Sequence, residues 1–185
     1  RFESVVVSTG QHREMLEQVN KRFGITPDHD LALMKPGQTL NELVARAIQG
    51  LDPIIEEEKP DVIISQGDTS TAMVAALAGF HKGVKVVHLE AGLRTGNIFS
   101  PFPEEANRKI IGQIASLHLA PTDESRENLR RENFRSKDIV VTGNTVIDAL
   151  LAASEWDVQF DDSRLEELRN SDEKLVLVTT HRREN

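Results

Sequence analysis

The sequence predicts an α/β fold in which a parallel sheet is covered by helices on both faces. Short apolar segments alternate along the chain with longer segments whose apolar residues recur every three or four positions. Strands that alternate with helices in this way form parallel βαβ units. The short segments, of which 61–65 is the clearest, are apolar throughout their middle rather than at every second residue. Such strands are typical of a sheet that is buried on both faces.

The predicted elements follow in order from the N-terminus. A β-branched run predicts a strand over 4–8, and apolar residues at helical spacing predict a helix over 12–23 that Gly24 ends. A longer apolar face predicts a helix over 39–58, which ends before Pro60. The later segments are shorter and alternate regularly. We predict strands over 61–65, 84–89, 117–120, 138–142 and 174–180, and helices over 69–81, 104–116, 125–133, 145–153 and 163–170.

Composition excludes several classes of function. The formal net charge of −8 argues against nucleic-acid binding, which needs a clustered Lys/Arg surface. The sequence contains no cysteine, so it has no disulfide, no thiolate zinc site and no cysteine nucleophile. No apolar run approaches the roughly 20 residues of a membrane span. We therefore expect a cytoplasmic protein that contacts neither membrane nor nucleic acid.

The carboxyl ends of the strands carry the most informative polar residues, because ligands of open α/β sheets bind beyond these ends. Asp68 follows one predicted strand and Glu90 follows the next, with a single helix between them. This arrangement matches one right-handed crossover, and neighbouring strands lie about 5 Å apart. Both carboxylates should then project from one edge of the sheet. Glu104 follows a loop bounded by prolines and can fold back over the same edge.

Two or three carboxylates around one site suit general acid/base chemistry. Close like charges separate the pKa values of such groups, so that one holds a proton while another accepts one. His181 stands at the end of the last predicted strand beside two arginines, which predicts an anion site. The residues present contain no glycine-rich nucleotide loop, no nucleophile elbow and no metal-ligand spacing. We expect acid/base chemistry without a cofactor or a metal.

Each of these residues also has a purely structural interpretation. Asp68 precedes Thr-Ser-Thr and could cap the following helix. Glu104–Glu105 begin a helix, where acidic side chains favour the helix dipole. His88 and His118 lie in or beside strands and are expected to be structural histidines with satisfied hydrogen bonds. His181 could belong to a solvated run of charge.

Six motifs together identify a family. They occur in one order with similar spacing and cover the chain apart from roughly 155–173. Their sequence resembles the bacterial non-hydrolysing UDP-N-acetylglucosamine 2-epimerases. The motifs are Gln11–Leu16 (QHREML), Gly67–Thr69 (GDT), His88–Gly96 (HLEAGLRTG), Pro101–Arg108 (PFPEEANR), Thr142–Ala149 (TGNTVIDA) and His181–Asn185 (HRREN).

This resemblance implies a Rossmann-like sheet that forms one half of a two-domain fold of the GT-B type. Residues 1–173 would form the N-terminal catalytic domain, and 174–185 would hold its last strand and the start of the connection to a C-terminal nucleotide-binding domain. The chain begins without a Met and ends just after a predicted strand. We therefore expect a piece of a longer homodimeric protein, inactive or poorly active when isolated.

The resemblance also implies a reaction and the residues that perform it. Members interconvert UDP-GlcNAc and UDP-ManNAc by eliminating UDP and adding it back to a 2-acetamidoglucal intermediate. By similarity, Asp68, Glu90 and Glu104 are the acid/base and sugar-contacting residues, and His181 and Arg94 bind the substrate.

Some bacterial members also bind a second UDP-GlcNAc as an activator. Gln11 and His12, together with Glu104, match positions associated with that second site. Glu14 and Gly37 stand where strongly regulated relatives are expected to have Gln and Arg. The resemblance therefore implies a possible activator site but does not decide whether substrate activates this protein.

Three alternatives remain open at this point. A hydrolysing relative would share most of the motifs and release UDP and free ManNAc. A glycosyltransferase of the GT-B type would need an acceptor and would give no epimer without one. The residues present could also form a nucleotide-sugar-binding or dimer-forming module that has no catalytic activity.

Overall fold

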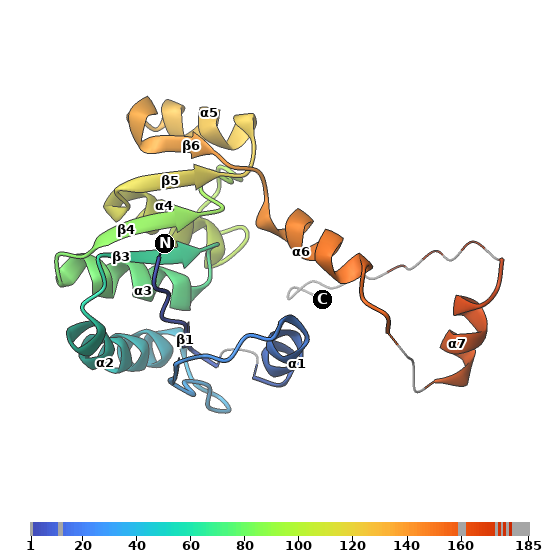
Figure 1. Ribbon diagram of the computed structural model, residues 1–185. Helices are drawn as coiled ribbons and strands as arrows, with labels where there is room; N and C mark the ends of the chain where they lie inside the picture. The colour runs from blue at the N-terminus through green and yellow to red at the C-terminus, as the bar shows by residue number, and fades with distance from the viewer. Residues whose placement is uncertain are drawn as a thin grey trace. The chain divides into compact units, whose positions relative to one another are not determined.

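The computed structural model describes residues 2–10, 13–158 and 162–172 and the single positions 174, 176 and 178, and it shows a parallel α/β fold (Figure 1). The chain divides into two compact units, Arg1–Thr145 and Val146–Asn185. The predicted domain boundary after residue 173 falls inside the second unit and stays a prediction. Among the described residues, no helix is both long enough and apolar enough to cross a lipid bilayer.

The helices and strands agree closely with those predicted, and most ends differ by one or two residues. The first unit contains β1 (Val7–Ser8), α1 (Arg13–Phe23), β2 (His29–Asp30), α2 (Leu40–Glu58), β3 (Val62–Gln66), α3 (Ser70–His81), β4 (Lys85–Leu89), α4 (Glu104–Ile114), β5 (Leu117–Ala120), α5 (Asp123–Arg131), a short 3₁₀ turn (Ser136–Asp138) and β6 (Ile139–Val141). The second unit contains most of α6 (Thr145–Ser154) and all of α7 (Ser163–Arg169).

The first predicted strand, 4–8, is wrong in its length. Only Val7–Ser8 pairs, because its partner β2 offers two residues and runs parallel to it. Ahead of β1 the backbone N–H of Val6 donates to Asp28 Oδ2 at 2.7 Å instead of joining a ladder. The sequence did not predict β2, since two residues carry no periodic signal. The strand predicted over 174–180 lies largely outside the described residues.

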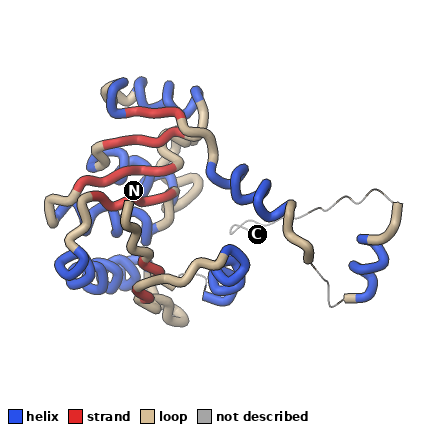
Figure 2. The backbone as a smooth tube through the Cα atoms, in the orientation of Figure 1, coloured by secondary structure: helices blue, strands red, loops and turns tan. Residues whose placement is uncertain are grey.

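Four parallel strands form the main sheet, in the order β3-β4-β5-β6 (Figures 1 and 2). Gln66 pairs with Leu89 at the carboxyl end of β3 and β4, and Leu89 pairs with Leu119 of β5. The parallel α/β class is confirmed. So is the expectation that the strands ending before Asp68 and Glu90 are neighbours.

Helices α3, α4 and α5 contact this sheet and bury alternate residues of its strands. Val86 of β4 packs in one core cluster with Ala76 of α3 and Ile111 of α4. On β3 the side chains that point away from these helices are exposed, as Val62 and Ile64 show. Packing against these helices holds the strands in place. The polar residues described below follow the carboxyl ends of the strands.

Candidate active site

Asp68 and Glu90 lie together at the carboxyl ends of β3 and β4. The backbone N–H of Gly67 donates to Leu89 O at 3.0 Å, which joins the two loops directly beyond the last strand pair. Both loops turn here, because Gly67 has a φ of +75° and Glu90 a φ of +63°. A methyl group built on Gly67 would lie 3.8 Å from Glu90 Oε2. The predicted shared edge is therefore present, and we call it the rim.

Asp68 does not cap the helix that follows it. The N-cap of α3 is Thr69, whose hydroxyl accepts from the N–H of Ala72 at 3.1 Å. Asp68 is instead held from α4, because its carboxylate forms an ion pair with Arg108. Its backbone carbonyl accepts from Asn107 Nδ2 at 2.8 Å. The capping interpretation of Asp68 is wrong, because its carboxylate pairs with Arg108 of α4 instead.

A buried carboxylate on α4 positions the arginine that meets Asp68. Glu105 has no exposed surface and accepts from Arg108 Nη1 at 3.1 Å. It also accepts from the backbone N–H groups of Thr95 and Gly96, at 3.2 and 3.3 Å. A buried charge is tolerated only when it is paired and hydrogen-bonded. The helix-dipole interpretation of Glu105 is therefore incomplete, because Glu105 ties the loop after Glu90 to Arg108.

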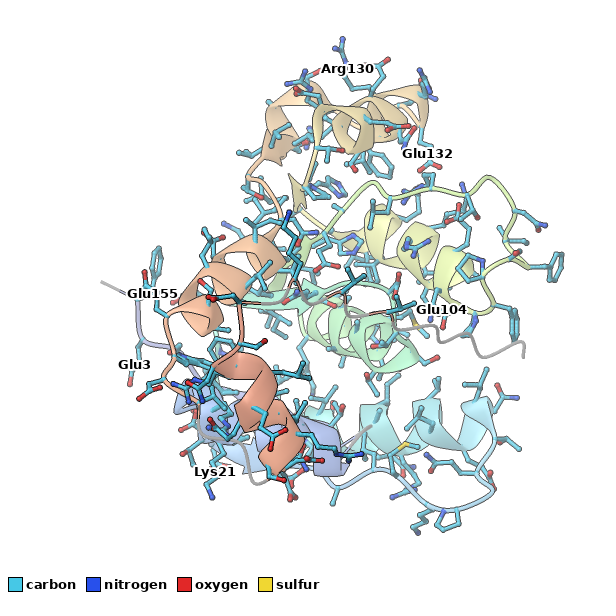
Figure 3. All side chains as sticks on the ribbon, turned by 90° about the vertical axis from the view of Figure 1, so that its right-hand side faces the viewer. Glu3, Lys21, Glu104, Arg130, Glu132 and Glu155 are labelled. Carbon is cyan, nitrogen blue, oxygen red and sulfur yellow. The ribbon has the colours of Figure 1, made fainter. Side chains whose placement is uncertain are left out.

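Sequence reasoning missed Arg108, Asn107 and the role of Glu105. One signal could have found Arg108: it follows Glu104 by four residues, so both side chains lie on one side of α4. Glu104 is half-buried and is the first residue of that helix (Figure 3). Its position, one turn before the arginine that pairs with Asp68, is compatible with the predicted place near the rim.

Glu90 is held by a neutral donor. Gln66 Nε2 donates to Glu90 Oε1 at 2.8 Å. The positive φ of Glu90 is uncommon for a residue with a side chain and carries an energetic cost. Residues held in such conformations cluster at functional sites. The rim therefore presents two carboxylates with different partners, a guanidinium for Asp68 and an amide for Glu90.

Arg94 lies in a network of ion pairs that links its loop to the end of α5. Its Nε and Nη2 donate to the two carboxylate oxygens of Glu132 at 2.9 and 2.8 Å, and Nη1 donates to Leu93 O at 2.9 Å. Lys109 of α4 donates to Glu132 at 2.6 Å. The hydrogen bond from Arg94 and then the one from Lys109 lower the pKa of Glu132 (Figure 3) to about 2. All three guanidinium nitrogens of Arg94 are thus engaged within the chain, and its role in substrate binding stays a prediction.

Two buried histidines lie side by side on β4 and β5. His88 pairs in register with His118, and each is 1% exposed. The His88 Nε2 atom lies 2.8 Å from Gly67 O and must donate to that carbonyl. Burial is the main reason why the pKa of His88 is lowered and that of His118 falls to about 4. Both are structural, as predicted, but they are not fully satisfied, because neither Nδ1 atom has a partner among the described residues.

The remaining predicted site residues lie outside the described residues. These are His181, assigned to substrate binding, and Gln11 and His12, assigned to an activator site. Their roles stay predictions. Within the described part of the chain, no group of three or more His, Asp and Glu side chains is placed to hold a metal ion.

Comparison with known proteins relates the whole chain to one family. The family model described as UDP-N-acetylglucosamine 2-epimerase matches residues 1–185. The UDP-N-acetylglucosamine 2-epimerase of Escherichia coli K12 is 50% identical over 189 aligned residues, which cover 100% of this chain and 50% of that protein. The chain spans about half the length of the curated relatives it matches.

Solved structures of the same family share the fold. One is the structure of a protein from Listeria monocytogenes that is named as a UDP-N-acetylglucosamine 2-epimerase, with 48% sequence identity and a TM-score of 0.89. The match covers 100% of this chain and 47% of that one. The UDP-GlcNAc 2-epimerase of Neisseria meningitidis, solved with bound UDP-GlcNAc, has 44% identity and a TM-score of 0.79. That match covers 91% of this chain and 43% of the other.

Proposed function

The chain belongs to the UDP-N-acetylglucosamine 2-epimerase family, and from that premise we propose that it is the catalytic half of an enzyme that interconverts UDP-GlcNAc and UDP-ManNAc. The observation that carries this proposal is the rim, where Asp68 and Glu90 extend from neighbouring strands. Inversion at one carbon requires a group that removes a proton from one face and a group that returns a proton to the other. Two carboxylates at one edge supply these groups without a cofactor.

We propose an elimination followed by an addition. The C2–H bond breaks and its electron pair forms the C1–C2 double bond. The C1–O bond breaks at the same time, and UDP leaves with the electron pair of the C1–O bond. The neutral 2-acetamidoglucal then accepts a proton at the opposite face of C2, and UDP adds back to C1. Departure of UDP makes the weakly acidic C2 proton removable, and no oxidation or reduction takes place.

The contacts support separate roles for the acidic residues. Glu90 and Asp68 are the acid/base pair, one for each face of C2. Arg108 positions Asp68 and balances its charge, whereas Gln66 orients Glu90 without cancelling its charge. Glu104, one helical turn before Arg108, contacts the sugar. His181 stabilises the leaving diphosphate, a role in which positive charge is aimed at developing negative charge.

We further propose the non-hydrolysing reaction in a cytoplasmic homodimer. The six motifs that resemble this branch of the family support the proposal. Product analysis by NMR decides between the branches. Release of UDP-ManNAc supports the proposal, and release of free ManNAc with UDP refutes it. Sedimentation of the full-length protein decides the oligomeric state.

The test of the site is incorporation of solvent deuterium at C2 by the chain extended to the full length of its relatives. We expect incorporation by the wild type and a loss of about a hundredfold or more in Asp68→Asn and in Glu90→Gln, the usual range for removing a general acid or base. Asp123→Asn is the matched control, because its side chain is 79% exposed on α5. Exchange at the wild-type rate in both rim variants would refute the assignment.

A further inference from the structure

Gln66 is the last residue of β3 and lies on the exposed side of the sheet. The exposed residues Val62 and Ile64 precede it on the same strand at alternate positions, whereas Ser65, between Ile64 and Gln66, is buried. Side chains alternate across a strand, so Gln66 points away from the helices that cover the other side. Its amide makes one contact that reaches the rim, the hydrogen bond of 2.8 Å from Nε2 to Glu90 Oε1.

The left-handed conformation of Glu90 is what allows this contact. Leu89 pairs with Gln66, and His88, one residue earlier, is buried on the helix side. A Glu90 that continued the strand would alternate back to the side of His88. With a φ of +63° the chain turns instead, and the carboxylate reaches the amide of Gln66. The amide thus stabilises an orientation that the backbone holds at a cost.

On the basis of the proposed function, we infer that Gln66 is a positioning residue that holds the Glu90 carboxylate in the geometry required for proton transfer at C2. The amide is neutral, so it fixes one carboxylate oxygen without pairing the charge. The second oxygen, Oε2, lies on the side of Gly67. Gln66 is exposed and belongs to no core cluster, so its contact with Glu90 contributes to the site more than to the fold.

The main test replaces the amide in the full-length enzyme with a side chain of similar length that cannot donate. Gln66→Met is expected to lower kcat for epimerisation about tenfold, since a hydrogen bond to a charged group is lost. The KM for UDP-GlcNAc should stay within about twofold, because binding is not the affected step. A poorly positioned base makes proton transfer slower relative to the other steps. The primary isotope effect, measured with UDP-GlcNAc and with UDP-ManNAc deuterated at C2, should therefore rise in the direction in which Glu90 removes the proton.

A second variant tests the charge. Gln66→Glu places a carboxylate where the amide donates, and like charges at this distance repel. We expect a loss of about a hundredfold in kcat at neutral pH, with partial recovery at lower pH as one proton is taken up by the pair. Ile64→Met is the matched control on the same side of β3 and should keep the wild-type kcat and isotope effect.

The contact itself is tested without any reaction. Thermal unfolding of Gln66→Met, Glu90→Ala and the double variant forms a cycle, and the two changes should couple rather than add. Additive effects, an unchanged kcat in Gln66→Met, or a loss of kcat with an unchanged isotope effect would each overturn the inference. If the wild type exchanges no deuterium, the proposed function fails, and the unfolding cycle still decides whether Gln66 holds Glu90.

Discussion

At the scale of single residues, the acidic side chains of the rim and its surroundings have partners of different kinds. Asp68 pairs with a guanidinium, Glu90 with an amide, and the buried Glu105 with two backbone N–H groups and Arg108. The carboxylates that we propose for catalysis are only half-buried, whereas Glu105 has no contact with solvent. Burial therefore separates the positioning carboxylate from those that can meet a substrate.

The buried histidines predict a loss of stability in mild acid. The folded protein lowers the pKa of His118 from the ordinary histidine value of 6.5 to about 4, because the ring is buried. Between pH 6.5 and pH 4, His118 binds a proton in the unfolded chain but stays neutral in the folded protein. The free energy of unfolding therefore falls as the pH is lowered. At pH 5 the loss from this residue is on the order of 2 kcal/mol.

His118→Phe should flatten this dependence, because phenylalanine keeps an aromatic ring beside Phe134, whose centroid lies 4.8 Å away, and does not titrate. Urea unfolding measured at intervals between pH 7 and pH 5 gives the slope. His81→Gln is the control at an exposed histidine and should keep the wild-type slope. A slope that is equally steep in His118→Phe would contradict the explanation. Part of the slope should remain, because burial also lowers the pKa of His88.

The sequence predicted the part of the site that depends only on the order of the strands. Asp68 and Glu90 each follow an apolar strand, and one crossover makes the strands neighbours, so local patterns sufficed. Arg108 was not predicted to meet Asp68, because that contact depends on how α4 packs beside α3. Gln66 was missed for another reason. Its contact requires the left-handed turn at Glu90, and no residue type in the sequence signals that turn.

At the scale of elements, one glycine sets how closely the loop after β4 approaches α5. Gly92 has a φ of +88°, and a Cβ built there would lie 2.2 Å from Ser125 O in the first turn of α5. The carbonyl of Gly92 also accepts from Asn128 Nδ2 at 3.0 Å. The loop that carries Arg94 to Gly96 is therefore packed against α5 backbone to backbone.

Gly92→Ala should be strongly destabilising, because the methyl group meets a fixed carbonyl and the left-handed backbone disfavours any side chain. We expect a loss of about 3 kcal/mol or more in urea unfolding. Gly96→Ala is the matched control: its φ of +80° gives the same backbone cost, but no heavy atom lies within 4 Å of the added Cβ. It should cost about 1 kcal/mol. Equal losses in the two variants would show that the close approach contributes nothing.

The elements themselves were predicted where periodicity is strong. Helices such as α2, and the strands β3 to β6, have apolar patterns that persist over several residues and matched the structure closely. The pair β1 and β2 was not predicted correctly, since two residues in each strand are set by tertiary contacts alone. The caps Thr69 and Thr122 begin α3 and α5. The sequence predicted that α3 starts one residue too early, at Thr69, and gave the cap to Asp68.

At the scale of the whole molecule, the rim belongs entirely to the first compact unit. Asp68, Glu90, Glu105 and Arg108 all lie within Arg1–Thr145. Arg108 pairs with both Asp68 and Glu105, and Glu90 accepts a hydrogen bond from Gln66 of the same unit. The chain nevertheless spans about half the length of its curated relatives. If the rim performs the acid/base chemistry that we propose, the isolated chain should keep the geometry of the rim but bind the nucleotide part of UDP-GlcNAc weakly.

The isolated chain should therefore fold without being an effective enzyme. We expect a cooperative thermal transition, weak or unmeasurable binding of UDP-GlcNAc by calorimetry, and C2 deuterium exchange at least about a hundredfold below that of the full-length protein. The matched control is the full-length Glu90→Gln variant, which should bind UDP-GlcNAc but not exchange. Exchange by the isolated chain at the full-length rate would show that these 185 residues suffice for the reaction.

The left-handed turn at Glu90 has a consequence for how this protein can be engineered. Glycine or asparagine would relieve the strained backbone there, so either should raise the melting temperature while removing the carboxylate. A thermostability screen that did not also select for turnover would favour such replacements. If Glu90 is catalytic as we propose, the residue that the reaction needs is also one that lowers thermal stability, so directed evolution must monitor turnover and melting temperature together at this position.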